Sequence, residues 1–209
     1  MFGITDLYLF IIAGLLLNIT PGADMLYILT NTFQKGLKAG VIATLGISTG
    51  CLIHVFLAVI GLSAILQSFP TAFLIVKYLG AIYLVYLGFS MLIKKQKKFD
   101  IDKNIDKKTI KNVFSKGVLI NALNPKVAIF FITFLPQFVD IDAESKSMAF
   151  LILGLIFIFF GTIVNIVIAY FALKGSSKLS LSKFFIKLIN KVTGLLFIGF
   201  AFRLAFQKA

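Results

Sequence analysis

The chain is poor in the residues that build redox and metal centres. Its 209 residues include one Cys, one His and no Trp. A single Cys, Cys51, cannot form a disulfide within the chain, which excludes a disulfide framework and redox chemistry that needs a cysteine pair. His54 lies three residues further on, and one His with one Cys is not a ligand set for zinc. We therefore expect no metal and no cofactor.

Acidic residues are also scarce, and almost all of them lie outside the apolar parts of the sequence. The chain has 8 Asp and Glu residues against 21 Lys and Arg, and Asp24 is the one acid deep inside an apolar run. Intramembrane peptidases need a Ser/His dyad, a pair of Asp residues or a zinc motif such as H-E-x-x-H. His54 has no evident nucleophile partner, so an intramembrane enzyme is the least favoured interpretation.

Apolar residues dominate what remains. Hydrophobic residues make up 59% of the sequence and charged residues only 14%. A soluble domain is about half apolar and about a quarter charged, so this composition is typical of a polytopic membrane protein of the all-α class. Runs long enough to cross about 30 Å of hydrocarbon predict six transmembrane helices. These predicted spans are residues 7–30, 39–66, 71–93, 115–138, 147–173 and 185–206.

The net charge of +13 comes from lysines in the segments between these spans. Sixteen lysines lie in the linkers after the first, third and fifth spans, nine of them between Lys94 and Lys116. The opposite side holds Lys146, Arg203 and Lys208 together with four acids. Because cytoplasmic loops carry the excess of Lys and Arg, both termini are predicted on the outer face of the membrane. The pattern is that of membrane loops, so we expect the lipid bilayer and no nucleic acid as a partner.

The two halves of the chain resemble each other. NITPGAD at 18–24 interrupts the first span, and NALNPK at 121–126 interrupts the fourth. KYLGAIYLVYLGF in the third span matches KVTGLLFIGFAFR in the sixth, which pairs Lys77 with Lys191 and Gly80 with Gly194. An odd number of spans, repeated once, predicts two inverted three-helix repeats with a site where the broken first and fourth helices meet. The chain is then one domain, with repeat one over about 1–93, a Lys-rich cytoplasmic linker over about 94–114 and repeat two over about 115–209.

Thr20-Pro21 and Asn124-Pro125 each indicate a helix that restarts inside the bilayer. Proline disrupts a helix interior but fits the first helical position, and Thr or Asn before it is a typical N-cap. Gly22 allows a backbone or a ligand to come close. Lipid offers no hydrogen-bond partners, so the N–H groups at the restarts need partners, and their dipoles favour an anion. The alternative is a pair of proline kinks repaired by neighbouring side chains.

Charged and polar side chains beside the two breaks form the candidate site. Asp24 and Lys126 are functional candidates because charges are costly at membrane depth. They either form a structural ion pair or bind the amino and carboxyl groups of a substrate, and Asp24 is also a candidate proton carrier. The predicted substrate-binding residues are Asn18, Thr20, Pro21, Gly22, Asp24, Asn121, Asn124, Pro125 and Lys126.

Three other features of the spans have alternative explanations. His54 is a second candidate for proton coupling, because imidazole titrates near neutral pH, or else a hydrogen-bonded packing residue. Gly46 and Gly50 form a G-x-x-x-G pair that predicts close helix packing. Asn165 is a buried polar residue for which we expect hydrogen bonds to another helix.

Several of these motifs together resemble the LysE/RhtB family of amino-acid exporters. The similar stretches, in chain order, are NITPGADMLYIL, GLKAGVIATLGISTG, LIHVFLAVIGL, KYLGAIYLVYLGF, NALNPKVAIFFITFLPQFVD and GLLFIGFAFRLA. The similarity runs over essentially the whole chain apart from the Lys-rich linker. The paired PG and NPK breaks are a hallmark of that family, although its motif has a second proline where this chain has Ala23.

The resemblance implies an exporter of amino acids or close derivatives in a bacterial inner membrane. It also implies coupling to the proton gradient or the membrane potential, and a homodimer in many members. The broken helices predict alternating access at a midplane site, in which one three-helix repeat rocks against the other. The family motifs do not separate its substrate groups, so the substrate stays open. The alternatives are an exporter of another small solute and a membrane scaffold without transport of its own.

Overall fold

The computed structural model describes residues 2–68, 70–93, 110–140, 142–174 and 183–206. These residues are almost entirely helical, and the only β pairing among them is one bridge between Ile4 and Val139, so the all-α prediction is confirmed. The elements are α1 (Leu7–Ile19), α2 (Ala23–Lys35), α3 (Leu37–Leu57), the π-helical turn η1 (Ala58–Leu62), α4 (Ser63–Ser68), α5 (Pro70–Ile93), α6 (Ile110–Ala122), α7 (Pro125–Thr133), the 3₁₀ turn η2 (Leu135–Phe138), α8 (Lys146–Lys174) and α9 (Lys183–Phe206).

Two helix pairs are broken where the prolines predict it. α1 and α2 are bent by 54° relative to each other, and α6 is bent by 47° relative to the segment Pro125–Phe138. Three residues separate α1 from α2 and two separate α6 from α7. The predicted interruption of the first and fourth spans is therefore confirmed, and each break lies within a pair that is long and apolar enough to count as one span.

The bounds of several helices differ from the predicted spans because hydrogen bonding continues into polar sequence. α2 runs to Lys35, five residues beyond the predicted end of the first span, and stops at Gly36 with φ 82°. A residue without a Cβ adopts that left-handed region readily, so Gly36 ends the helix where the polar residues before it do not. α6 begins at Ile110, five residues before the predicted fourth span.

The predicted second span is interrupted near its end. α3 stops at Leu57, and a π-helical turn over Ala58–Leu62 leads into the short α4. The hydroxyl of Ser147 in α8 donates to the carbonyl of Val59 at 3.3 Å. π turns occur mostly as single turns within α-helices, and this one lies where α8 packs against the helix.

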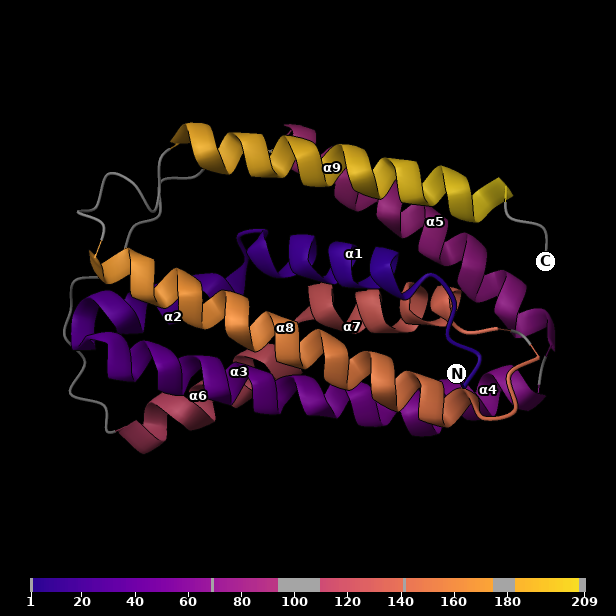
Figure 1. Ribbon diagram of the computed structural model, residues 1–209, viewed down its shortest axis with the longest axis horizontal. Helices are drawn as coiled ribbons and strands as arrows, with labels where there is room; N and C mark the ends of the chain where they lie inside the picture. The colour runs from indigo at the N-terminus through magenta and orange to yellow at the C-terminus, as the bar shows by residue number, and fades with distance from the viewer. Residues whose placement is uncertain (1, 69, 94–109, 141, 175–182, 207–209) are drawn as a thin grey trace.

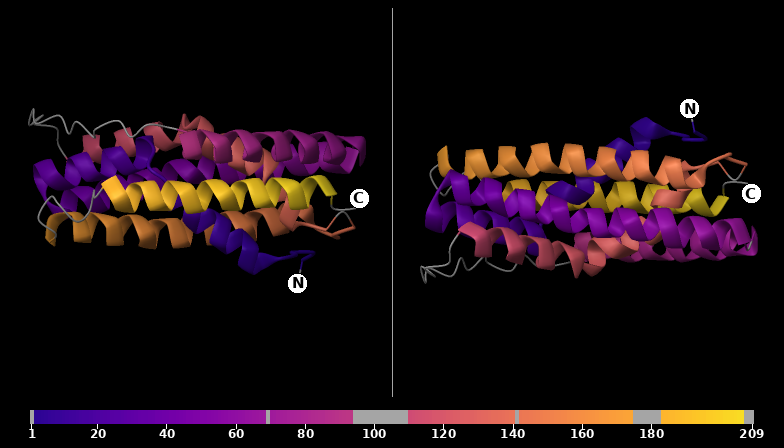
Figure 2. Two further views of the ribbon diagram at one scale, coloured as in Figure 1. Left: turned by 90° about the horizontal axis from the view of Figure 1, so that it is seen from above. Right: turned by 90° about the horizontal axis from the view of Figure 1, so that it is seen from below.

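The helices lie side by side along the long axis of the molecule (Figures 1 and 2). α3 packs along α6, α8 and α2, whereas the main partner of α5 is α9. α1 and α7 lie between these two groups: α1 contacts α8 and α9, and α7 contacts α5 and α3. One helix of each broken pair, α1 or α7, thus lies between the two groups of helices.

Glycines allow the closest crossings. A Cβ on Gly46 would lie 2.3 Å from the Phe114 carbonyl oxygen, and one on Gly50 would lie 2.4 Å from the Val118 carbonyl oxygen. The predicted role of this G-x-x-x-G pair in helix packing is therefore confirmed, with α6 as the partner. Gly88 and Gly194 form a second crossing, in which a Cβ on either would lie within 2.8 Å of the other's carbonyl oxygen.

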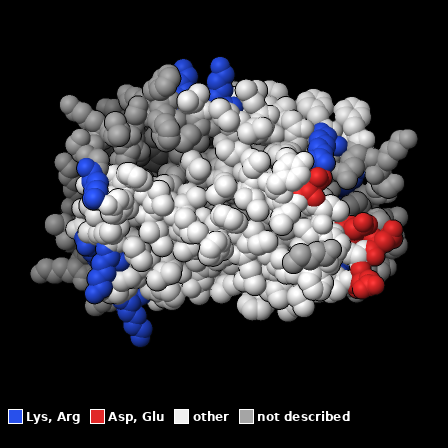
Figure 3. Space-filling view, in the orientation of Figure 1, with Lys and Arg blue, Asp and Glu red and all other residues white. Residues whose placement is uncertain are grey.

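Charge is divided between the two ends of the bundle. Figure 3 shows most Lys and Arg side chains towards the end that carries the α2–α3 turn, and Asp and Glu at the opposite end, where both described termini lie. Asp6 lines a pocket with Arg203, and Asp140, Asp142 and Glu144 line another with Phe2 and Gly3. The middle of the visible face is free of exposed charge, as expected for a surface that contacts lipid.

Length and composition support four of the six predicted spans. Leu37–Ile65 and Lys146–Lys174 are each long and apolar enough to cross a membrane, and each broken pair passes the same test when taken as one span. In α5 the apolar stretch is shorter, Lys77–Ile93. The six-span count therefore stays a prediction.

Candidate functional site

The first break is organised differently from the prediction. Thr20 does not cap α2: it is the C-cap of α1, and its hydroxyl donates to the Leu16 carbonyl at 2.7 Å. Pro21 lies in the link, Gly22 in extended conformation is the N-cap, and α2 begins at Ala23. The prediction that Thr20-Pro21 starts the second helix is wrong, because the Thr hydroxyl bonds back to its own helix, as Thr side chains commonly do.

The second break follows the prediction. Asn124 is the N-cap of α7, and its Oδ1 accepts the backbone N–H of Lys126 at 3.0 Å. Pro125 occupies the first helical position, where it needs no hydrogen bond. The side chain of Asn124 thereby satisfies one of the N–H groups that the restart exposes.

Asp24 reaches from the first half of the chain into the second break. It lies in the first turn of α2, and its Oδ2 accepts hydrogen bonds from Asn121 Nδ2 at 3.0 Å and from Asn124 Nδ2 at 2.9 Å. Its other oxygen, Oδ1, is buried and has no hydrogen-bond partner among the described residues, and the same holds for Asn121 Oδ1. Asp24 therefore anchors the two halves to each other with one oxygen and leaves the other available.

Lys126 makes the reciprocal connection. It lies in the first turn of α7, and its Nζ donates to the carbonyl oxygens of Leu17 at 2.6 Å and Thr20 at 3.0 Å. These carbonyls belong to the end of α1, where the helix dipole favours a cation. Among the described residues, no hydrogen bond or salt bridge joins Asp24 to Lys126, so of the two alternatives for these charges the structure does not show the direct ion pair. Lys126 instead bonds to backbone carbonyls at the end of α1, and Asp24 bonds to the side-chain amides of Asn121 and Asn124 in the second half.

A small cavity lies between these two charges. Its volume is about 20 Å³, which is room for about one water molecule. Six of the predicted site residues line it: Asn18, Thr20, Gly22, Asp24, Asn124 and Lys126. Three do not: Pro21 and Pro125 are part of the breaks, and Asn121 holds Asp24 from behind.

Five lining residues were not predicted as part of the site. They are Leu17, Met25, Val127, Phe157 and Asn165. The four apolar ones give no signal in so apolar a sequence, since only the fold shows which of many such residues face the cavity. Asn165 stands out in the sequence because it is a polar residue in an apolar span. The expected hydrogen bond to another helix is absent among the described residues, and its side chain lines the cavity instead.

His54 lies behind the cavity rather than in its wall. Its Nε2 is 2.9 Å from the carbonyl oxygen of Asn121, and its ring packs 6.0 Å from the ring of Phe131. A carbonyl oxygen only accepts, so the imidazole donates this hydrogen bond. The geometry is that of a packing residue that fixes the end of α6. A role of His54 in proton coupling stays a prediction.

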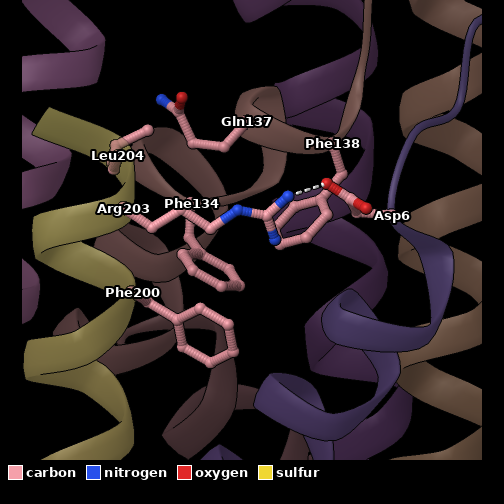
Figure 4. Close-up of a pocket in the computed structure, with 7 residues that line it drawn as sticks. All are labelled: Asp6, Phe134, Gln137, Phe138, Phe200, Arg203 and Leu204. Carbon is pink, nitrogen blue, oxygen red and sulfur yellow. Dashed lines mark hydrogen bonds and ion pairs between the residues drawn. The ribbon is translucent and has the colours of Figure 1, made fainter. Parts of the chain in front are cut away.

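A second pocket lies towards the acidic end of the bundle. Its volume is about 30 Å³, and Arg203 from α9 reaches across it to form an ion pair with Asp6 at the start of α1 (Figure 4). Gln137 lies beside this pair, and the rings of Phe134, Phe138 and Phe200 and the side chain of Leu204 line the rest of the pocket.

Phenylalanine rings form a continuous row of contacts between the linings of the two pockets. Phe157 in the wall of the central cavity packs 5.2 Å from Phe130, and Phe130 packs 4.9 Å from Phe134 in the second pocket. Phe134 in turn contacts Phe138 at 4.8 Å and Phe200 at 5.8 Å between ring centroids. A continuous aromatic column thus separates the central cavity from the end of the bundle that carries the acids.

Comparison with known proteins assigns the chain to a family. Residues 15–208 match the model of the LysE type translocator family. The chain belongs to this family. It is similar to the protein named leucine efflux protein of Klebsiella pneumoniae subsp. pneumoniae, with 30% identity over 207 residues, 98% of this chain and 96% of the relative. Proteins of the same name from Salmonella choleraesuis and Enterobacter sp. are each 29% identical, and the alignments cover 98% of this chain and 96% or 97% of the relative.

Membership of the LysE type translocator family identifies a membrane transport protein rather than an enzyme. It agrees with the resemblance that the sequence motifs indicated, and the match includes both breaks and nearly all of both halves. No solved structure matches the chain.

Proposed function

We propose that this LysE type translocator is a secondary active exporter of amino acids across the bacterial inner membrane. The observation that carries the proposal is the reciprocal anchoring of Asp24 and Lys126 around one buried cavity. Opposite charges on either side of a cavity at two helix breaks match the ammonium and carboxylate groups of an amino acid. The leucine efflux proteins among the relatives support this assignment.

The site fits a zwitterion with an apolar side chain. Asp24 Oδ1 is free to accept from an ammonium group, and Lys126 has used two of its three N–H donors, which leaves one for a carboxylate. The charges of Asp24 and Lys126 cancel, so a substrate without net charge leaves no unpaired charge in the membrane. Leu17, Met25, Val127 and Phe157 provide the apolar wall that an aliphatic side chain requires. We therefore propose neutral aliphatic amino acids as the substrate class.

Transport requires the cavity to expand, because about 20 Å³ does not hold an amino acid. We propose alternating access between two inverted three-helix repeats, about 1–93 and about 115–209, in one domain. The helix packing supports this division. Corresponding spans of the two halves pack against each other, namely α3 against α8 and α5 against α9. In addition, α3 of the first half packs against α6 of the second, and in the same way α8 of the second half packs against α1 of the first. Most of the Lys-rich linker, residues 94–109, lies outside the described residues.

We further propose that both termini face the outside, because the lysine-rich end of the bundle then faces the cytoplasm (Figure 3). In that orientation the aromatic column and the Asp6–Arg203 pair close the outer path from the cavity. Export to the outside then requires Phe130 and Phe134 to part. We also propose that transport is coupled to protons through Asp24, with His54 as a second candidate. A homodimer is a further part of the proposal.

Counterflow of labelled leucine in proteoliposomes made with the purified protein tests the proposal. The unsubstituted protein is expected to exchange leucine, and Asp24→Asn is expected to abolish exchange because it removes the charge that binds the ammonium group. Asp142→Asn is the matched control, since Asp142 is an exposed acid at the end of the bundle, away from the cavity. Normal exchange by Asp24→Asn would remove Asp24 from the mechanism, and no amino-acid exchange by the unsubstituted protein would favour the scaffold alternative.

A further inference from the structure

Asn165 is a buried amide that protein groups leave unused. Its side chain lies on α8, is 6% exposed and faces the central cavity. None of the described residues forms a hydrogen bond with its amide. Thr162, one turn earlier on the same helix, is by contrast fully engaged: its hydroxyl donates to the Ile158 carbonyl at 2.7 Å and accepts from Ser48 at 2.6 Å.

An unpaired amide is costly at this depth. A carboxamide carries two N–H donors and one carbonyl acceptor, and in an apolar environment these groups need hydrogen-bond partners. A leucine of similar size would fit an apolar helix without this penalty. A ligand that enters the cavity provides the partner that the folded chain lacks.

The position of Asn165 corresponds to that of His54 in the other half. Gly50 lets α3 approach the second break, because a Cβ there would lie 3.0 Å from Asn121 Cβ, and His54 one turn later bonds the Asn121 carbonyl. Gly161 lets α8 approach the first break, because a Cβ there would lie 2.8 Å from Asn18 Oδ1, and Asn165 follows one turn later. The carbonyls at the first break are already bound by Lys126, so Asn165 has no such partner.

We propose that Asn165 binds the substrate carboxylate together with Lys126 and so selects for uncharged amino acids. This inference rests on the proposed function. A carboxylate has two oxygens, and Lys126 has one N–H left, so the cavity is short of donors on that side. The amide of Asn165 supplies them without adding charge, which keeps the net charge of the site at zero. A carboxylate at this position would instead add a negative charge and favour a cationic amino acid.

Counterflow in proteoliposomes with labelled leucine, and with unlabelled leucine and lysine as competitors, tests this role. Asn165→Ala is expected to raise the half-saturating leucine concentration about 10-fold or more, because a hydrogen bond to a charged group is lost. Asn165→Asp keeps the size of the side chain. In this variant we expect unlabelled leucine to compete less strongly with the labelled leucine, and unlabelled lysine to compete more strongly. Thr162→Val is the matched control: it removes the Ser48 bond on the same helix without touching the cavity, and leucine affinity should stay within about 2-fold.

The outcomes separate this inference from the proposed function. In one outcome the unsubstituted protein is active, and Asn165→Ala and Asn165→Asp keep its affinity for leucine and its preference for leucine over lysine. That result would overturn the role of Asn165 and leave the proposed function standing. Asn165→Asp decides the matter if Asn165→Ala cannot be purified in folded form. An unsubstituted protein that exchanges no amino acid would overturn both proposals. A shift towards lysine in Asn165→Asp supports the role, since a change in packing alone does not reverse charge selectivity.

Discussion

Asn124 holds the two halves together and caps a helix, and replacing it removes both functions. Its Oδ1 accepts the Lys126 N–H at 3.0 Å, and its Nδ2 donates to Asp24 at 2.9 Å. Loss of a cap costs about 1 kcal/mol, and loss of a hydrogen bond to a charged group costs about 1.5–3 kcal/mol. Asn124→Ala is therefore expected to lower the free energy of unfolding by about 2.5–4 kcal/mol.

Asn124→Ser separates these two contributions. Serine is a good N-cap, so α7 keeps its cap, but its side chain is too short to replace the amide that donates to Asp24. We expect this variant to lose only about 1.5–3 kcal/mol. The measurement is unfolding of the purified protein in detergent micelles titrated with SDS, with helical circular dichroism as the readout.

A double-mutant cycle tests the contact itself. Asp24→Ala, which leaves no acceptor, combined with Asn124→Ala measures how much of each loss depends on the other residue. We expect a coupling free energy above about 1 kcal/mol, because the Asp24–Asn124 bond joins residues 100 positions apart and is partly buried. Additive losses, or an Asn124→Ser variant as stable as the unsubstituted protein, would refute the reasoning that this contact anchors the halves.

Three further predictions concern packing, the outer pocket and orientation. Gly88→Ala is expected to lower the free energy of unfolding by about 1–3 kcal/mol, because its Cβ would lie 2.7 Å from the Gly194 carbonyl oxygen. In the same SDS titration Gly199→Ala, where nothing lies within 4 Å, should be neutral or stabilising, and equal losses would contradict the crossing. Arg203→Gln should cost less than about 1 kcal/mol in that assay, since its ion pair is exposed. A membrane-impermeant maleimide added to whole cells should label Asp142→Cys but not Lys38→Cys, and the reverse would overturn the proposed orientation.

The positions of the breaks could be predicted because they depend on local chemistry. Proline cannot continue a helix, and Asn124 before Pro125 is a typical cap, so the restart of α7 follows from a few adjacent residues. The same rule failed at Thr20, where two local options compete. The Thr hydroxyl can cap the next helix or bond back to its own, and the sequence does not decide between them.

The contacts across the site could not be predicted, because they join residues far apart in the chain. Asp24 bonds to Asn121 and Asn124, and Lys126 bonds to Leu17 and Thr20. These partners are 97 to 109 positions apart in the sequence. The motifs indicated that opposite charges lie near both breaks. Charge alone favours a direct pair, but an unsatisfied helix end attracts a charge equally well, and only the packing of the halves decides which partner is nearer.

The π turn is a further feature without a local signal. Ala58–Leu62 reads AVIGL, which continues the apolar end of α3 without a proline or a polar residue. The turn lies where the hydroxyl of Ser147 from α8 reaches the Val59 carbonyl, so its partner comes from the other half of the chain. Tertiary packing therefore fixes this element, just as it fixes the contacts of the site.

The unsatisfied groups at the site carry more information than the satisfied ones. Lipid supplies no hydrogen bonds, so a broken helix persists only if protein groups bind its free ends, and Asn124 and Lys126 do this. Asp24 Oδ1 is buried without a hydrogen-bond partner among the described residues, at a cost of about 1–3 kcal/mol, and the side chain of Asn165 lines the same cavity. A purely structural break would have no reason to keep this cost, because apolar residues of the same size avoid it. A ligand that donates to Asp24 and accepts from Asn165 removes it, and an amino acid does both through its ammonium and carboxylate groups.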